Sequence, residues 1–176
     1  VALDALSKEA RVDVLSAGTI QDGRYLILFG GEVEPVEFSF NKAVEAAAHT
    51  LRDAVFLPWA DERIVPAIVD SALRWPAPGD TLGVMQNPTS PTMIQAVDAA
   101  LKGALVDLVQ LRIGDGLGGR AIATLWGETS AVEAALELAE DVAGNPDWSA
   151  QIIRNADGAV RDAVLGGTGF FREWRG

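Results

Sequence analysis

The stretch DAALKGALVD, residues 98–107, repeats a stretch near the start of the chain, DALSKEARVD, residues 4–13. The two stretches lie 94 positions apart, from residue 4 to residue 98. The identical pairs are Asp4/Asp98, Ala5/Ala99, Lys8/Lys102, Ala10/Ala104, Val12/Val106 and Asp13/Asp107. This repetition decides the fold, because it divides the chain into two similar modules.

The repeat continues beyond the following loop, where the offset becomes 96 because the first loop is two residues shorter. The identical pairs there are Gly23/Gly119, Arg24/Arg120, Gly31/Gly127, Glu32/Glu128, Val36/Val132, Glu37/Glu133, Ala60/Ala156 and Asp61/Asp157. A period near 95 residues is too long for a solenoid repeat. We therefore predict a first module over residues 1–74, a linker at 75–79, a second module over 80–165 and a tail at 166–176.

The second copy has the order β-α-β-β-α-β-α. Apolar residues at helical spacing, Met93, Ile94, Val97 and Leu101, predict a helix. Ser130, with Glu133 three residues later, forms a capping box that predicts the start of a second helix. The expected strands are 81–86, 105–113, 120–126 and 149–154, the helices are 91–104, 130–142 and 157–165, and residues 114–119 form a glycine loop.

By its match to the second copy, the first copy is expected to form strands at 12–19, 24–29 and 54–59 and helices at 34–51 and 61–73. Val1 aligns with Gln95, so the second copy's residues 80–94 have no counterpart. A module that lacked this strand would expose a sheet edge. We therefore expect the natural chain to extend further at its N-terminus.

The composition excludes several classes of partner and site. The chain has 25 acidic and 14 basic residues, a net charge of -11, and no basic cluster, which disfavours nucleic acid and anionic membranes. It has no cysteine, which excludes disulfides and thiolate metal sites. No apolar run approaches the roughly 20 residues of a membrane helix.

Catalytic patterns are weak. His49 is the single histidine, so no histidine-based triad or metal cluster can form. Gly114, Gly116 and Gly119 match a dinucleotide fingerprint, but residues 120–126 predict a strand where that site needs a helix N-terminus. The duplicated aspartates are more typical of structural roles than of acid–base pairs. We predict no catalytic residue, no metal and no cofactor.

The second copy resembles the bacterial microcompartment (BMC) domain. The family motifs D-x-x-x-K, K-I-G-x-G-L and G-[DE]-x-x-A-V correspond here to DAALK at 98–102, RIGDGL at 112–117 and GETSAV at 127–132. The first copy shows DALSK at 4–8 and GEVEPV at 31–36. The resemblance implies an α/β (α+β) fold of two tandem ferredoxin-like domains with antiparallel four-stranded sheets flanked by helices.

The resemblance also implies a function. Two fused copies are similar to the trimeric class of shell proteins, whose homotrimer is a pseudohexameric tile with a pore for metabolites, in the shell of a compartment in the bacterial cytoplasm. The residues implied to line the pore are Thr19, Ile20, Gln21, Asp22, Gly23, Ile113, Gly114, Asp115, Gly116, Leu117 and Gly118. Asp115 would stand at the narrowest point, where three copies would favour cations and neutral molecules over anions. Gln21 replaces the cysteine that binds an iron–sulfur cluster in some members, so we expect no cluster.

Lys8, Lys102 and Arg154 are implied to lie at tile edges, against other shell proteins. A lysine at a helix C-terminus also has a simpler role, stabilising the helix dipole, and both roles stay open. The family's P-R-P-H edge motif is replaced by LPWA at 57–60 and IRNA at 153–156. The tail at 166–176, with Phe170, Phe171 and Trp174, either folds back on the tile, which we favour, or binds an encapsulated cargo enzyme or a neighbour.

The alternative function is a cytosolic trimeric ligand-binding or sensor protein of ferredoxin-like domains. It predicts a discrete small-molecule cleft and no assembly into sheets.

Overall fold

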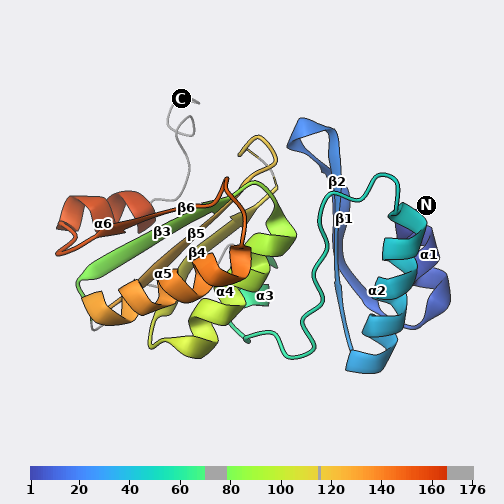
Figure 1. Ribbon diagram of the computed structural model, residues 1–176, viewed down its shortest axis with the longest axis horizontal. Helices are drawn as coiled ribbons and strands as arrows, with labels where there is room; N and C mark the ends of the chain where they lie inside the picture. The colour runs from blue at the N-terminus through green and yellow to red at the C-terminus, as the bar shows by residue number, and fades with distance from the viewer. Residues whose placement is uncertain (70–78, 115, 166–176) are drawn as a thin grey trace, which may run out of the picture.

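The chain forms two modules that lie side by side, as Figure 1 shows. A computed structural model describes residues 1–69, 79–114 and 116–165. Most of the predicted linker, the predicted pore residue Asp115 and the predicted tail lie outside the described residues.

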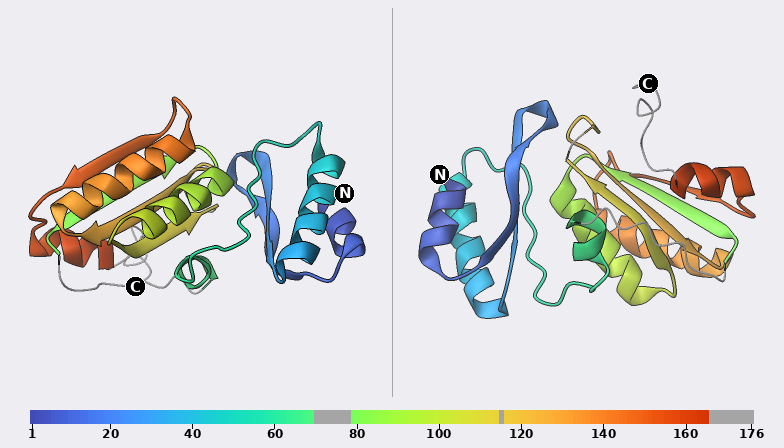
Figure 2. Two further views of the ribbon diagram at one scale, coloured as in Figure 1. Left: turned by 60° about the horizontal axis from the view of Figure 1, so that its bottom comes forward. Right: turned by 180° about the vertical axis from the view of Figure 1, so that it is seen from behind.

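The first module is a hairpin covered by helices on one side (Figure 2). Its strands β1 and β2 pair antiparallel, and a short 3-10 turn joins them. Its elements are α1 (Ala2–Glu9), β1 (Asp13–Ile20), the turn (Gln21–Gly23), β2 (Arg24–Gly30), α2 (Val33–Ala47) and α3 (Ile64–Val69).

The second module is a four-stranded sheet in the order β4-β5-β3-β6, and every neighbouring pair is antiparallel. Its elements are β3 (Thr81–Asn87), α4 (Ser90–Gly103), β4 (Asp107–Ile113), β5 (Ala121–Gly127), α5 (Thr129–Ala143), β6 (Ser149–Ile153) and α6 (Gly158–Leu165). The predicted β-α-β-β-α-β-α order is confirmed.

The duplication extends to the details of the backbone. The β1–β2 ladder has a register shift between Val14 and Ser16. The β4–β5 ladder has one between Leu108 and Gln110, which are the equivalent positions at the offset of 94. A β-bulge twists a strand locally. Both hairpins therefore share a distortion that the residue pattern did not predict.

The strand predicted at residues 54–59 was wrong, because these residues have no regular secondary structure. In the second module the equivalent strand, β6, pairs only with β3. Among residues 1–69, the part of the first module that the structure describes, β1 and β2 pair only with each other and no strand equivalent to β3 is present. A strand needs a neighbour for its backbone hydrogen bonds, so residues 54–59 stay irregular.

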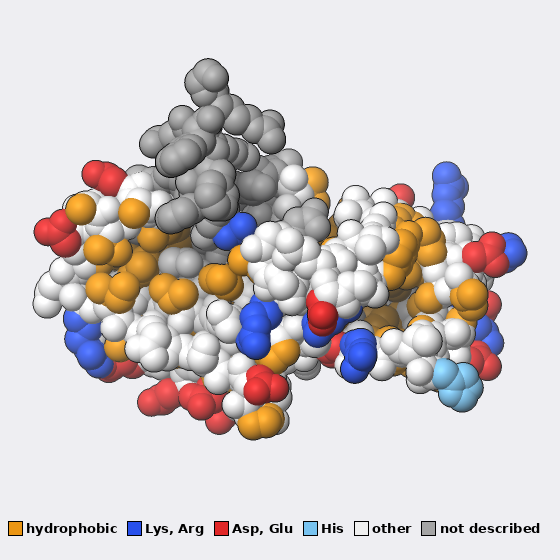
Figure 3. Space-filling view, turned by 90° about the horizontal axis from the view of Figure 1, so that it is seen from above, with side chains coloured by type: hydrophobic (Ala, Val, Ile, Leu, Met, Phe, Trp, Pro, Cys, Tyr) orange, Lys and Arg blue, Asp and Glu red, His pale blue; other side chains and the backbone are white. Residues whose placement is uncertain are grey.

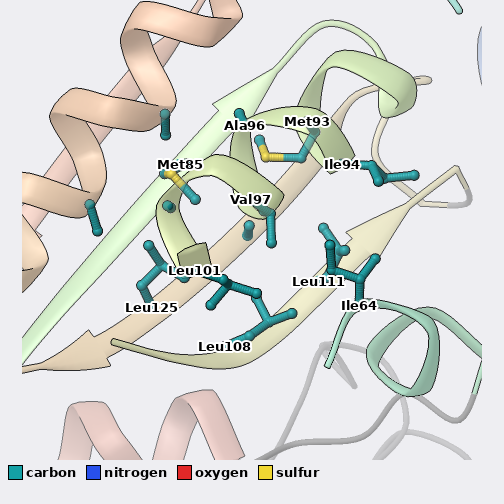
Figure 4. Close-up of a cluster of buried hydrophobic side chains, with 14 of the residues drawn as sticks. Ile64, Met85, Met93, Ile94, Ala96, Val97, Leu101, Leu108, Leu111 and Leu125 are labelled. Carbon is teal, nitrogen blue, oxygen red and sulfur yellow. The ribbon is translucent and has the colours of Figure 1, made fainter. Parts of the chain in front are cut away.

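The main core lies between the second module's sheet and the helices α4 and α5 (Figure 4). Met85 from β3, Met93 and Val97 from α4, and Leu125 from β5 are fully buried there. A smaller cluster of Leu82, Val109 and Trp126 lies beneath α6 on the other face. Helices therefore cover both faces of this sheet.

Helix α3 belongs to the first module in sequence but packs against the second. Its residues Ile64 and Ala67 are buried in the same core as α4 and β4. The segment between α2 and α3 therefore connects the first module to a helix that packs in the second module. The two modules share part of one core.

The core can be tested with two leucines on either side of the start of β4. Leu108 is 1% exposed, and Leu105 is 92% exposed. We expect Leu108→Ala to lower the free energy of unfolding by about 3 kcal/mol, because it removes buried apolar volume. Leu105→Ala is the matched control and is expected to change it by less than about 0.5 kcal/mol. Denaturant titration followed by tryptophan fluorescence measures both, and equal effects would contradict this core.

Candidate functional site

The two loops predicted to line a pore lie together at the upper edge of the two modules, where the modules meet (Figure 1). The side-chain oxygen of Gln21 accepts a hydrogen bond from the backbone N–H of Gly118 at 2.5 Å. The guanidinium of Arg24 donates to the carbonyl oxygen of Gly119 at 3.3 Å. Equivalent loops from the two modules are therefore joined directly.

Glycine is required in this loop cluster for two reasons. Gly114, Gly116, Gly118 and Gly119 have φ angles of 85°, 78°, 60° and 75°, a region that other residues rarely adopt. A Cβ atom on Gly119 would also lie 3.0 Å from the carbonyl oxygen of Gln21. The backbones of the two loops approach closely because this side chain is absent.

The predicted pore residues form a largely exposed surface. Thr19, Gln21, Asp22, Gly23, Gly116 and Gly118 are exposed, Ile20, Ile113 and Leu117 are half-buried, and Gly114 is buried. The Asp22 carboxylate lies 2.9 Å from the guanidinium of Arg24. Basic side chains lie near the middle of this face, between the modules, in Figure 3. The charge of Asp22 is therefore balanced locally.

Two further contacts attach the first module to the N-terminus of α4. Arg24 donates to the carbonyl oxygen of Pro88 at 2.7 Å. The Asp53 carboxylate accepts from the N–H of Thr92 at 2.9 Å and from its hydroxyl at 2.8 Å, and also from the Thr89 hydroxyl. A carboxylate here satisfies orphan donors of the first helical turn. The repeat pointed to Arg24, whereas nothing in the sequence singled out Asp53.

A second contact region, which we call the seam, joins residues 59–63 to residues 98–107. The Asp61 carboxylate accepts two hydrogen bonds from the Arg63 guanidinium, both at 2.8 Å. Arg63 also donates to the carbonyl oxygen of Val106 at 2.9 Å. The backbone N–H of Asp61 donates to the Asp98 carboxylate at 2.8 Å. Charged and backbone groups of both modules therefore satisfy one another.

Hydrogen bonds within the seam shift the pKa values of Asp61 and Arg63. Hydrogen bonding from Arg63 lowers the pKa of the Asp61 carboxyl, while burial opposes this shift. The hydrogen bond to Asp61 raises the pKa of Arg63. A lowered carboxyl pKa means that the charged form is stabilised by folding. This contribution is present above the ordinary value of 3.8 and is lost as the pH falls through the lowered pKa.

The three predicted edge residues lie in three different places. Lys102 lies in the seam, 2.7 Å from Asp98, and also donates to the Trp59 carbonyl. Lys8 pairs with Asp4 on α1, at the far side of the first module (Figures 1 and 2). Arg154 pairs with Glu133 on α5. The repeat indicated Lys102, but Arg63 has no repeated counterpart and was missed.

A cleft of about 1670 Å³ lies beside β2 and is lined mainly by β2, α2 and residues 49–58 of the first module, and also by residues 89–91 at the start of α4 in the second. This volume exceeds the 300–1,000 Å³ or so of most small-molecule sites. Within the described ranges, no group of three or more His, Asp or Glu residues could hold a metal ion. The described helices also include none that is long and apolar enough to cross a membrane.

A family model described as the BMC domain matches both modules, over residues 1–59 and 81–157. This chain belongs to the BMC domain family. The two matches confirm the duplicated BMC domains that the repeat predicted.

A curated relative from Citrobacter freundii, the bacterial microcompartment shell protein PduT, is 30% identical to this BMC protein over 80% of this chain and 76% of its own. A solved microcompartment protein from Desulfitobacterium hafniense DCB superposes with a TM-score of 0.76 at 29% identity, over 92% of this chain and 89% of its own. The chain is thus a bacterial microcompartment shell protein.

A fused permuted hexameric shell protein from the RMM microcompartment is more distant. It superposes with a TM-score of 0.55 at 20% identity, over 81% of this chain and 76% of its own. This likeness concerns the BMC fold alone.

The seam can be tested by removing its arginine. We expect Arg63→Met to lower the free energy of unfolding by about 2 kcal/mol at pH 7, because Asp61 and the Val106 carbonyl lose charged donors. Arg154→Met is the matched control, since it breaks an exposed ion pair that contributes at most about 1 kcal/mol. Urea titrations of both variants compare the losses.

The pH dependence of the same variants provides a second check. The stability difference between wild type and Arg63→Met is expected to shrink as the pH falls below 3.8 through the lowered pKa of Asp61. A difference that stays constant down to pH 2.5 or so would contradict the role of this carboxylate.

Proposed function

We propose that three copies of this chain form a pseudohexameric tile whose central pore passes metabolites across the microcompartment shell. The observation that carries the proposal is the direct contact between the equivalent loops of the two modules, through Gln21 and Arg24. Equivalent loops that meet at one end of adjacent modules are what a ring around a central axis requires.

The arrangement of the modules supports a closed ring. The seam joins the end of one module to the α4 and β4 side of the next, so the contact is head-to-tail. Head-to-tail contacts build rings when the rotation between units closes. With two modules in each chain, three chains supply six.

The pore proposal assigns the loop residues described above to its lining. Asp22 is already paired with Arg24, so we assign the carboxylate that faces the axis to Asp115, the position that the family resemblance implies. Three such carboxylates around one axis repel one another and raise the local negative potential. Such a ring favours cations and neutral metabolites over anions.

We infer a structural and transport role and no catalysis. Both the family and its named relatives support this role, since the relatives are shell proteins. An active site needs a convergent set of nucleophile, acid–base and stabilising groups. The loop cluster offers backbone groups, glycines and a paired aspartate instead.

The cleft of the first module favours the alternative, a ligand-binding sensor. The space beside β2 corresponds, however, to the place that β3 and β6 occupy beside β5 in the second module. We therefore interpret this space as the position of strands equivalent to β3 and β6 and not as a small-molecule site. We conclude in favour of the tile.

The partners that we propose follow from the tile. A second and a third copy complete the ring, and other shell proteins surround it. Lys8 and Arg154 are exposed in the single chain, so both are accessible for contacts with a second copy of the chain or with other shell proteins. An encapsulated cargo enzyme is the partner proposed for the tail if it does not fold back.

Native mass spectrometry and negative-stain electron microscopy of the purified chain test the proposal. We expect the mass of a trimer and a flat disc with a central opening, and the discs are expected to tile into sheets with other shell proteins. A protein that stays monomeric at all concentrations would overturn the tile.

The charge of the pore can be tested by ion flux through tiles in a planar bilayer. We expect Asp115→Asn to raise the permeability of anions relative to cations by about threefold, because a screened charge near the axis is removed. Glu140→Gln makes the same change in net charge on α5, away from the loops, and is expected to leave the ratio unchanged. Equal ratios for all three proteins would count against Asp115 in the pore.

A further inference from the structure

The chain contains two similar ion pairs, only one of which is covered. Asp98 and Lys102 on α4 lie 2.7 Å apart, with side chains 9% and 46% exposed. Asp4 and Lys8 on α1 also lie 2.7 Å apart, but their side chains are 66% and 74% exposed. The difference arises because the backbone of residues 59–61 contacts the first of these pairs, through the Asp61 N–H and the Trp59 carbonyl.

The covering turn also occurs twice. The Asp61 carboxylate accepts from the N–H of Arg63 at 3.0 Å, and the Asp157 carboxylate accepts from the N–H of Ala159 at 2.8 Å. The carbonyl oxygens of these aspartates each accept from the N–H three residues on, at 3.1 and 3.0 Å. Asp157 and Asn155 are exposed. One turn therefore covers an ion pair, and its equivalent does not.

We propose that residues 155–157 of one chain bind the Asp4–Lys8 pair of a second copy. By equivalence with the seam, the N–H of Asp157 donates to the Asp4 carboxylate of the neighbouring copy. The ammonium group of Lys8 donates to the neighbouring carbonyl of Asn155. This inference rests on the proposed trimer and assigns its chain–chain contacts.

The positions of the two surfaces fit this contact. Helix α1 lies at one end of the molecule, and β6 with α6 lies at the other (Figures 1 and 2). Each chain thus has an uncovered Asp4–Lys8 ion pair at one end and an unoccupied turn at residues 155–157 at the other. A head-to-tail contact uses both, and it repeats the relation that the two modules already have within the chain.

The chain–chain contact is smaller than the seam. Helix α3 crosses to the neighbouring module, whereas the equivalent helix α6 packs on its own module through Val160 and Val164. Position 63 is arginine, but its equivalent, position 159, is alanine. The bonds from Arg63 to the carbonyls of Leu101 and Val106 therefore have no copy between chains.

Because position 159 is alanine where position 63 is arginine, an Ala159→Arg variant is expected to strengthen the chain–chain contact. Arg63 also lies 3.7 Å from Asp107, whose equivalent in the first module is Asp13. An arginine at position 159 would reach Asp157 in its own chain, and Asp13 and the Val12 carbonyl of the neighbour. We expect Ala159→Arg to lower the dissociation constant of each chain–chain contact by about tenfold.

Loss of the contact is measured with the whole chain by analytical ultracentrifugation across a concentration series. We expect Asp4→Ala to raise the dissociation constant of each contact by about tenfold. Glu45→Ala is the control, because it removes the acidic partner of Lys42 in a comparable exposed pair on α2. Circular dichroism establishes that each variant is folded before its association is compared.

Cross-linking gives a direct readout, since the chain has no cysteine of its own. A Lys8→Cys/Asn155→Cys variant treated with a short bismaleimide is expected to yield covalent dimers and trimers. A His49→Cys/Asn155→Cys variant replaces an exposed residue beyond the end of α2 and is expected to stay single-chain.

The outcomes separate this inference from the proposed function. A wild-type trimer whose stability is unchanged by Asp4→Ala and Ala159→Arg, and that does not cross-link through positions 8 and 155, overturns the inference and leaves the tile intact. A wild-type chain that is monomeric at every concentration overturns the tile and this contact together. Opposite shifts of the dissociation constant, with specific cross-links, support the contact.

Discussion

The arrangement of the two modules depends on a charged network that neither module could satisfy alone. Asp61 and Arg63 come from the first module, but their remaining hydrogen-bonding capacity is met by Asp98 and the Val106 carbonyl of the second. A half-buried carboxylate or guanidinium without partners is costly, so separating the modules would leave several polar groups unpaired. This constraint places α3 in the second module's core and brings the glycine loops together.

Duplication produced two modules that have since come to differ in what they pack against. Both keep the hairpin with its bulge, the Asp-x-x-x-Lys helix and the turn around Asp61 or Asp157. They differ in the destination of the last helix, which packs on the other module in one case (α3) and on its own module in the other (α6). In the proposed ring, the shared features would recur at every contact between modules, and the differing helix would make the contact within the chain stronger than the one between chains.

Local patterns predicted much of the fold, because hydrophobic periodicity, caps and the repeat all act over short distances. Residues 54–59 were assigned wrongly since their strand character depends on a distant partner, which no local pattern reveals. The loop cluster was predicted from its glycines and from its likeness to a family. Arg63 and Asp53 were missed because each acts through backbone groups of the other module, and neither is repeated in sequence.

The glycines of the second loop also restrict which of its positions can carry a side chain. Gly114, Gly116, Gly118 and Gly119 hold left-handed conformations, and Gly119 closely approaches the neighbouring loop. A side chain at any of these four would strain the backbone. In the proposed pore, positions 115 and 117 are therefore the ones within residues 114–119 where a substitution can alter the width or charge of the aperture while the backbone path of this loop stays the same.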